Sequence, residues 1–124
     1  RQIWQAALSI PGLRVPFIPD YISHAAYKCY VFIRPEDLRG DWSRDKILQE
    51  INARGVPAFS GSCSEVYLEH AFDATGWRPN PHLPIARELG ETSVMLMVHP
   101  TLTALEIDRT IGALRDVMVE AVGF

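Results

Sequence analysis

The segment YKCYVFIRP, residues 27–35, decides the class of fold that this sequence specifies. Alternation along a strand places two sets of side chains on opposite faces, Tyr27, Cys29, Val31 and Ile33 on one and Tyr30 and Phe32 on the other. Pro35 lacks a backbone N–H and ends the pattern. We therefore expect a strand over residues 27–34, and because both of its faces are apolar, we expect neighbours to cover each face.

Two helices are predicted by the residues at their ends. Ser43 can cap the N-terminus of one helix, and Gly55 suits the left-handed position that ends it. Thr103 and Glu106 have the spacing of a capping box and open a long C-terminal helix. The buried stripes of these helices are predicted to be Ile47, Leu48 and Ile51 in the first, and Ile107, Ile111, Leu114, Met118 and Ala121 in the second.

Shorter elements fill the rest of the chain. Ser62 and Glu65 also have capping-box spacing and predict a helix that runs to about Phe72. Residues 73–82 are rich in glycine and proline and predict a loop, and residues 57–60 and 92–98 predict strands. The helix between those strands is expected to have Pro84 in its first turn and Gly90 at its end, with an inward face of Ile85, Ala86 and Leu89.

The first residues predict the end of a helix, with an apolar face of Ile3, Trp4, Ala7 and Leu8, stopped by Pro11-Gly12. The chain starts at Arg1 without a methionine, so we expect it to begin inside a larger protein or to have been processed. Residues 1–19 are interpreted as this helix end and a linker, and residues 20–124 as one domain. The predicted fold class is α/β, in the two-layer α+β sense, with a small antiparallel or mixed sheet and helices packed on one side.

Composition excludes several classes of function. The 124 residues carry 12 Lys and Arg against 15 Asp and Glu, and without a basic run we expect no nucleic-acid partner. No apolar run approaches the roughly 18 residues that span a bilayer, so no membrane partner is expected. The cysteines, Cys29 and Cys63, and the four histidines lack metal-ligand spacing. We expect no metal site, reduced thiols and a cytoplasmic location.

Candidate chemistry centres on one loop. Cys63 at a predicted helix start could act as a nucleophile, and the loop GSCS, residues 61–64, could contact a phosphate. Capping of the predicted helix N-terminus by these small polar residues is the alternative explanation for both features. The two lysines, Lys28 and Lys46, have no neighbours that would desolvate them for Schiff-base chemistry. The sequence therefore predicts no catalytic residue and no cofactor site within this chain.

An ordered set of short motifs resembles the C-terminal domain of the DegT/DnrJ/EryC1/StrS family, the pyridoxal-phosphate-dependent sugar aminotransferases. The set comprises His24, Tyr27 and Tyr30, then Arg44, Ile47, Ile51 and Gly55-Val56, then Gly76-Trp77, LPIAREL at 83–89, His99-Pro100, Leu102-Thr103 and Glu106. The match extends over nearly the whole chain. It implies the small domain of a fold-type-I aminotransferase, preceded in the parent protein by an interdomain helix.

The resemblance also implies what the parent protein does. A missing N-terminal large domain would bind pyridoxal phosphate, and the parent would be a homodimer that transfers an amino group from glutamate to a nucleotide-linked keto-sugar in amino-sugar biosynthesis. This chain would shape the substrate pocket and the dimer without being catalytic alone. We also expect the strand face of Tyr30 and Phe32 to be exposed apolar surface that the large domain covers.

The family commonly has a substrate-facing loop where this sequence has residues 57–64. The resemblance therefore implies that Phe59, Ser60 and Ser62 contact the substrate. Two alternatives remain from the sequence: a non-enzymatic α/β binding or regulatory module, and a thiol enzyme that uses Cys63.

Overall fold

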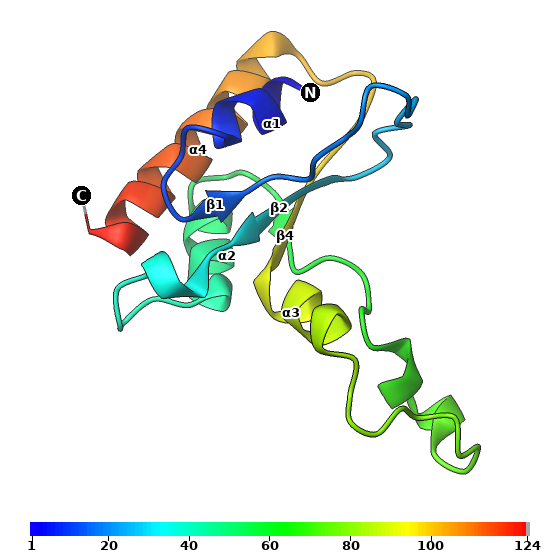
Figure 1. The fold of residues 1–124 in the computed structure, drawn as a ribbon. Helices are drawn as coiled ribbons and strands as arrows, with labels where there is room; N and C mark the ends of the chain where they lie inside the picture. Colours follow the sequence, from blue (N-terminus) through cyan, green and yellow to red (C-terminus); the bar gives the residue numbers. More distant parts are fainter. Residues whose placement is uncertain (124) are drawn as a thin grey trace.

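A small antiparallel sheet organises the protein in the computed structural model, which describes residues 1–123 (Figure 1). Its strands lie in the order β1 (Leu13–Arg14), β2 (Cys29–Ile33), β4 (Ser93–Leu96) and β3 (Ala58–Phe59). The central pair places Val31 opposite Val94, and every neighbouring pair is antiparallel. The predicted two-layer α+β fold is confirmed, and the sheet is antiparallel rather than mixed.

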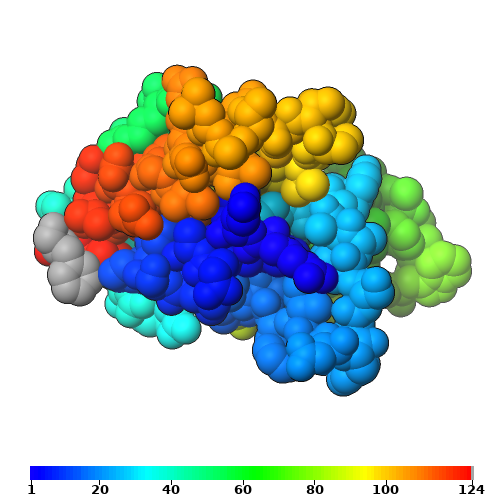
Figure 2. Space-filling view, turned by 90° about the horizontal axis from the view of Figure 1, so that it is seen from above, coloured from blue at the N-terminus to red at the C-terminus, as the bar shows by residue number. Residues whose placement is uncertain are grey.

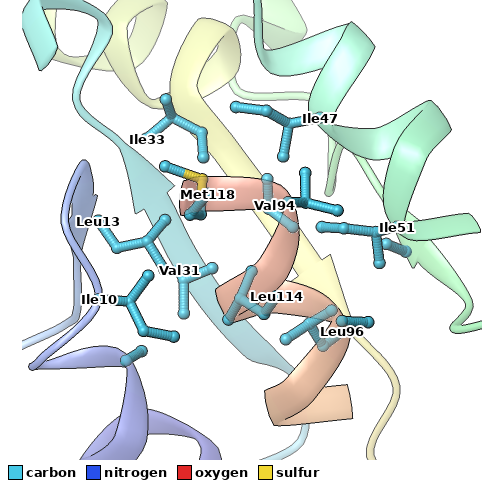
Figure 3. Packing of buried hydrophobic residues seen from close by; sticks show 14 of the residues in the cluster. Ile10, Leu13, Val31, Ile33, Ile47, Ile51, Val94, Leu96, Leu114 and Met118 are labelled. Carbon is cyan, nitrogen blue, oxygen red and sulfur yellow. The ribbon is translucent and has the colours of Figure 1, made fainter. Parts of the chain in front are cut away.

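Three of the four α-helices within residues 1–123 form the second layer. These are α1 (Gln2–Ala7), α2 (Arg44–Ala53) and α4 (Ala104–Val122), whose buried side chains join one cluster with those of β2 and β4. Figure 3 shows Leu114 and Met118 of α4 packed over the sheet beside Ile47 and Ile51 of α2. The fourth helix, α3 (Pro84–Thr92), lies toward the other face, where Glu88 contacts Arg14 of β1.

The ends of α2 and α4 form as their sequences predict. The side chain of Ser43 accepts a hydrogen bond from the backbone N–H of Lys46, 3.2 Å away, and Gly55 has φ +76° just after the helix. At α4, the side chain of Thr103 accepts from the N–H of Glu106, and the Glu106 carboxylate accepts from the N–H of Thr103. Both helices start at a side chain that satisfies backbone donors with no partner inside the helix.

The N-terminal residues pack into the same core. Ile3 and Ala7 of α1 are buried, whereas Leu8 is 65% exposed, so its predicted place on the inner face is wrong. The helix ends at Ala7, and the turn that follows carries the side chain of Leu8 outward. The core continues through Ile10 and Leu13. The division of the chain at residue 19 stays a prediction.

The predicted helix over residues 62–72 is wrong. The structure has two short 3₁₀ turns there, Val66–Leu68 and His70–Phe72. The expected capping pair is engaged elsewhere: the Ser62 hydroxyl bonds to Lys28, and the Glu65 carboxylate accepts from the hydroxyl of Tyr67. No residue between 61 and 83 is buried, so an amphipathic helix would have had no core to pack against.

Other predicted elements are displaced by a few residues. The first strand begins at Cys29, so Tyr27 precedes it and is 82% exposed. The strand expected over residues 92–98 covers Ser93–Leu96, because α3 continues through Gly90 to Thr92. Ile85 is 65% exposed, so only part of the predicted inner face of α3 turns inward.

Residues 61–83 extend away from the two layers, and we call them the projecting segment (Figures 1 and 2). The guanidinium of Arg78 holds it together by donating to the carbonyls of Tyr67 and Leu68, at 2.8 and 3.1 Å, and by pairing with Asp73. Within residues 1–123, no helix has the length and apolar character needed to cross a bilayer.

Candidate functional site

The predicted substrate loop begins at the free edge of the sheet. Phe59 ends β3 opposite Met95 of β4, and its side chain is 47% exposed. The next residue, Ser60, is tied to the sheet through its carbonyl, which accepts a hydrogen bond from the buried hydroxyl of Ser93 at 2.5 Å. This bond fixes the direction in which the chain leaves β3.

Ser62 is the point where the loop meets the central strand. Its Oγ lies 2.8 Å from Nζ of Lys28 and 3.2 Å from the hydroxyl of Tyr30. The backbone N–H of Ser62 also donates to the Tyr30 hydroxyl, at 3.2 Å. Residues more than 30 positions apart therefore form one polar cluster, which we call the Lys28–Tyr30–Ser62 cluster.

Gly61 allows this contact. It has φ +95°, a backbone conformation that residues with a side chain rarely adopt. A Cβ built on Gly61 would lie 2.8 Å from Cε1 of Tyr30 and 3.1 Å from Oγ of Ser93. The loop can therefore lie directly on the Tyr30 ring only because position 61 has no side chain.

The electrostatics of the cluster favour negative charge. The hydrogen bond from Ser62 lowers the pKa of the Tyr30 phenol below its usual value, and the Lys28 ammonium lowers it further. Tyr30 stacks on Phe32 with ring centroids 6.3 Å apart, and the guanidinium of Arg14 lies 4.6 Å from the Phe32 centroid. Cations thus lie at both ends of this pair of aromatic rings.

Beyond the loop lies a shallow cavity of about 340 Å³, lined by residues that include Ser60, Ser62, Cys63 and Arg44. Arg44 is the first residue of α2, and its Nη1 donates to the carbonyls of Gly90 and Ser93, each at 3.0 Å. Arg44 thereby joins α2 to the connection between α3 and β4. Its side chain is positioned by these bonds at one wall of the cavity.

Cys63 does not have the surroundings of an activated thiol. Its Sγ lies 3.4 Å from a carboxylate oxygen of Glu69, to which it donates. Partial desolvation, together with this bond and the negative charge of Glu69, raises the pKa of the thiol. A nucleophilic cysteine needs the opposite change, because the thiolate is the reactive form. The local geometry therefore argues against the thiol-enzyme alternative.

The remaining candidate groups are dispersed. The histidines contact different parts of the chain: His24 accepts from the N–H of Ala26, His99 bonds to Thr101, and His82 lies 3.2 Å from a carboxylate oxygen of Glu65. Within residues 1–123, no three His, Cys, Asp or Glu side chains are placed to hold a metal ion. Both cysteines are free, Cys29 buried and Cys63 exposed.

The structure brings some predicted residues together and adds others. Phe59, Ser60 and Ser62 follow one another from the sheet edge onto the central strand, as their order in the chain requires. Lys28 and Tyr30 were not predicted as site residues. Their spacing of two positions was the available signal, because residues i and i+2 of a strand share a face.

Comparison with known proteins gives structural matches only. No protein-family model matches the sequence, and no curated protein matches it. An aminotransferase from Psychrobacter cryohalolentis is 46% identical, with a TM-score of 0.87, over 97% of this chain and 33% of its own. DesV of S. venezuelae is 20% identical with a TM-score of 0.78, over 94% of this chain and 29% of its own.

A DegT DnrJ EryC1 StrS aminotransferase from Brucella abortus is 20% identical, with a TM-score of 0.72, over 93% of this chain and 28% of its own. The chain therefore spans about a third of the length of the aminotransferases that it matches. Its antiparallel sheet, with three helices packed on one face, is the fold of an aminotransferase C-terminal domain. The chain is thus similar to part of these aminotransferases, one of which is a DegT DnrJ EryC1 StrS aminotransferase.

Proposed function

We propose that this chain is the C-terminal small domain of a cytoplasmic, pyridoxal-phosphate-dependent aminotransferase that acts on a nucleotide-linked keto-sugar. The observation that carries the proposal is the 46% identity to an aminotransferase over 97% of the chain. Glutamate is the proposed amino donor. The domain contributes to the substrate pocket and to a homodimer, and it is not catalytic alone.

The cofactor is assigned to the missing large domain, because the residues present do not fit it. A Schiff-base lysine needs a desolvated or cation-flanked amine. The ammonium of Lys46 instead bonds to the carbonyl and carboxylate of Asp41, at 3.1 and 3.3 Å, and that of Lys28 bonds to Ser62. When bound elsewhere in the protein, pyridoxal phosphate acts as the electron sink for amino transfer.

The substrate contacts are assigned to Phe59, Ser60 and Ser62. The exposed ring of Phe59 can pack on a sugar or base, and the hydroxyls of the two serines can donate to or accept from substrate oxygens. Anchoring of the loop by Ser93 and Tyr30 supports this role, because a preorganised loop loses less freedom when the substrate binds.

The large domain is proposed to cover the outer face of the sheet around Tyr30, Phe32 and Phe59. These aromatic side chains are all partly exposed, and the three core helices lie on the opposite face. An exposed apolar face of this kind usually marks an interaction surface. Replacing Phe32 by aspartate should then weaken cofactor retention in the full-length protein, whereas Phe17→Asp, at an exposed site in the N-terminal stretch, should leave it unchanged.

The proposed activity is tested on the full-length protein that contains this chain. With pyridoxal phosphate, it should show cofactor absorbance and release 2-oxoglutarate from glutamate when a nucleotide-linked keto-sugar is supplied. Cys63→Ala should retain this activity, since the thiol has no assigned role. A full-length protein without cofactor absorbance would instead favour a non-enzymatic binding module, and loss of activity in Cys63→Ala would support the thiol enzyme.

A further inference from the structure

We propose that Lys28 binds an oxyanion of the substrate, with Ser62 and Tyr30 as its hydrogen-bonding neighbours. The inference deepens the proposed function and rests on it. It adds a charged group next to Ser62, one of the substrate contacts proposed so far, on the side of a second cavity. It also states the chemistry that this group recognises, which is phosphoryl or carboxylate oxygen.

The first observation is the state of the Lys28 ammonium. Among the described residues, lysine pairs with a carboxylate only at Lys46, whose Nζ lies 3.3 Å from Oδ2 of Asp41. Lys28 instead donates to the neutral hydroxyl of Ser62 at 2.8 Å and lies 5.9 Å from the ring centroid of Tyr27. An ammonium has three donors, so a partly exposed Lys28 keeps both charge and hydrogen-bonding capacity for a ligand.

The second observation is the cavity next to Lys28. It is distinct from the cavity lined by Ser60 and Ser62, has a volume of about 350 Å³, and its lining includes the apolar side chains of Trp4, Met97 and Leu102. Among residues 1–123, the ionisable side chains that line it are Arg1, Lys28, Cys29 and His99, none of them a carboxylate, although the chain has a net charge of −3. A cavity lined by apolar and basic side chains suits a ligand that has a flat or apolar body and an anionic group.

The third observation is that Lys28 has a fixed position. It precedes Cys29, the first residue of β2, and its Nζ contacts the loop at Ser62. The Tyr30 hydroxyl bonds to the backbone of this loop, and the loop can lie against the Tyr30 ring because Gly61 has no side chain. The loop therefore places the Ser62 hydroxyl next to the Lys28 ammonium. A hydroxyl and an ammonium at 2.8 Å can both donate to one oxyanion, and such charge-assisted bonds are stronger than neutral ones.

The experiment measures anion binding to the cofactor-saturated full-length protein by isothermal titration calorimetry. The two probes are inorganic pyrophosphate, which stands for a phosphoryl group, and glutarate, which stands for a donor carboxylate. Lys28→Met should weaken binding of one probe about tenfold, as expected for loss of a hydrogen bond to a charged group. Lys28→Arg should restore most of the affinity, and Lys46→Met, at the other lysine, should change nothing.

The two arms locate the oxyanion. A Lys28→Met effect on pyrophosphate places it on the nucleotide-linked acceptor, and an effect on glutarate places it on the amino donor. Equal affinities of wild type and Lys28→Met for both probes, or no binding by the wild type, would overturn the inference. Because cofactor absorbance is recorded in the same samples, its absence would mark failure of the proposed function separately.

Discussion

The backbone of Gly61 lies directly against the ring of Tyr30, where a Cβ would come within 2.8 Å of Cε1. Gly61 also has φ +95°. Gly61→Ala therefore combines backbone strain with a clash, and we expect it to lower the free energy of unfolding by about 1–3 kcal/mol. Urea denaturation of the full-length protein measures this change.

The matched control for Gly61 is Gly112, which lies within α4 and has no atom within 4 Å of the Cβ it would gain. Gly112→Ala should raise the free energy of unfolding by about 0.5–1 kcal/mol, because alanine loses less conformational freedom than glycine in a helix. Equal effects of the two substitutions would contradict the close approach of the loop to Tyr30.

Leu114 tests the core between α4 and the sheet. Its side chain is 1% exposed and packs among the residues shown in Figure 3. Leu114→Ala should destabilise the protein by about 2–5 kcal/mol through lost burial and a cavity. Leu105→Ala removes the same atoms from a residue of the same helix that is 76% exposed, and should cost about 0.5 kcal/mol or less. Thermal unfolding followed by circular dichroism compares the two.

The capping box of α4 predicts a pH dependence. Backbone and side-chain hydrogen bonds from Thr103 hold the pKa of Glu106 below its ordinary value of 4.5. A carboxyl group with a lowered pKa in the folded state stabilises the protein above pH 4.5, and this contribution is lost as the pH falls through the folded-state pKa. Wild type should therefore be more stable than Glu106→Gln at pH 7, and the difference should shrink below pH 4.5.

Two further variants separate the parts of that cap. Thr103→Ala removes the hydroxyl that accepts from the N–H of Glu106 and should cost about 1 kcal/mol, whereas Thr103→Ser keeps the hydroxyl and most of the stability. A wild-type to Glu106→Gln difference that stays constant from pH 7 to pH 3 would argue against the ionised cap.

Arg78 tests the projecting segment. Its guanidinium donates to the carbonyls of Tyr67, Leu68 and Glu69. Arg78→Ala removes these bonds where no buried side chain compensates, so amide hydrogen exchange within residues 61–83 should become about threefold to tenfold faster. Arg87→Ala, which removes only an exposed pair with Glu91, should not change exchange there. Unchanged exchange in Arg78→Ala would mean that other contacts hold the segment.

Elements with local signals at both ends could be predicted from the sequence. Ser43 and Gly55 enclose α2, and Thr103 with Glu106 opens α4, because caps satisfy backbone groups of nearby residues. The alternation of Cys29, Val31 and Ile33 likewise predicted the buried face of β2. In these elements the deciding interactions lie within a few residues of one another.

The segment after β3 had a similar signal and did not form the predicted helix. Ser62 and Glu65 have capping-box spacing, but Ser62 bonds to Lys28 and Tyr30, and Glu65 to Tyr67. A local cap contributes only about 1 kcal/mol, so contacts made elsewhere can override it when no apolar face of the helix is buried. For the same reason, the sequence did not predict that Lys28 and Tyr30 form a cluster with Ser62, which lies more than 30 positions away.

The sequence by itself determined the buried face of the central strand and the capped helices, because each depends on short-range order and on the spacing of apolar side chains. Only the tertiary structure decided where the loop after β3 lies and which residues it contacts. In the folded chain Gly61 lies against the ring of Tyr30, Ser62 bonds to Lys28, and residues 61–83 lie outside the core. The physical reason is that all polar groups that the fold brings near a side chain compete to bond with it, and its neighbours in sequence are only some of these groups.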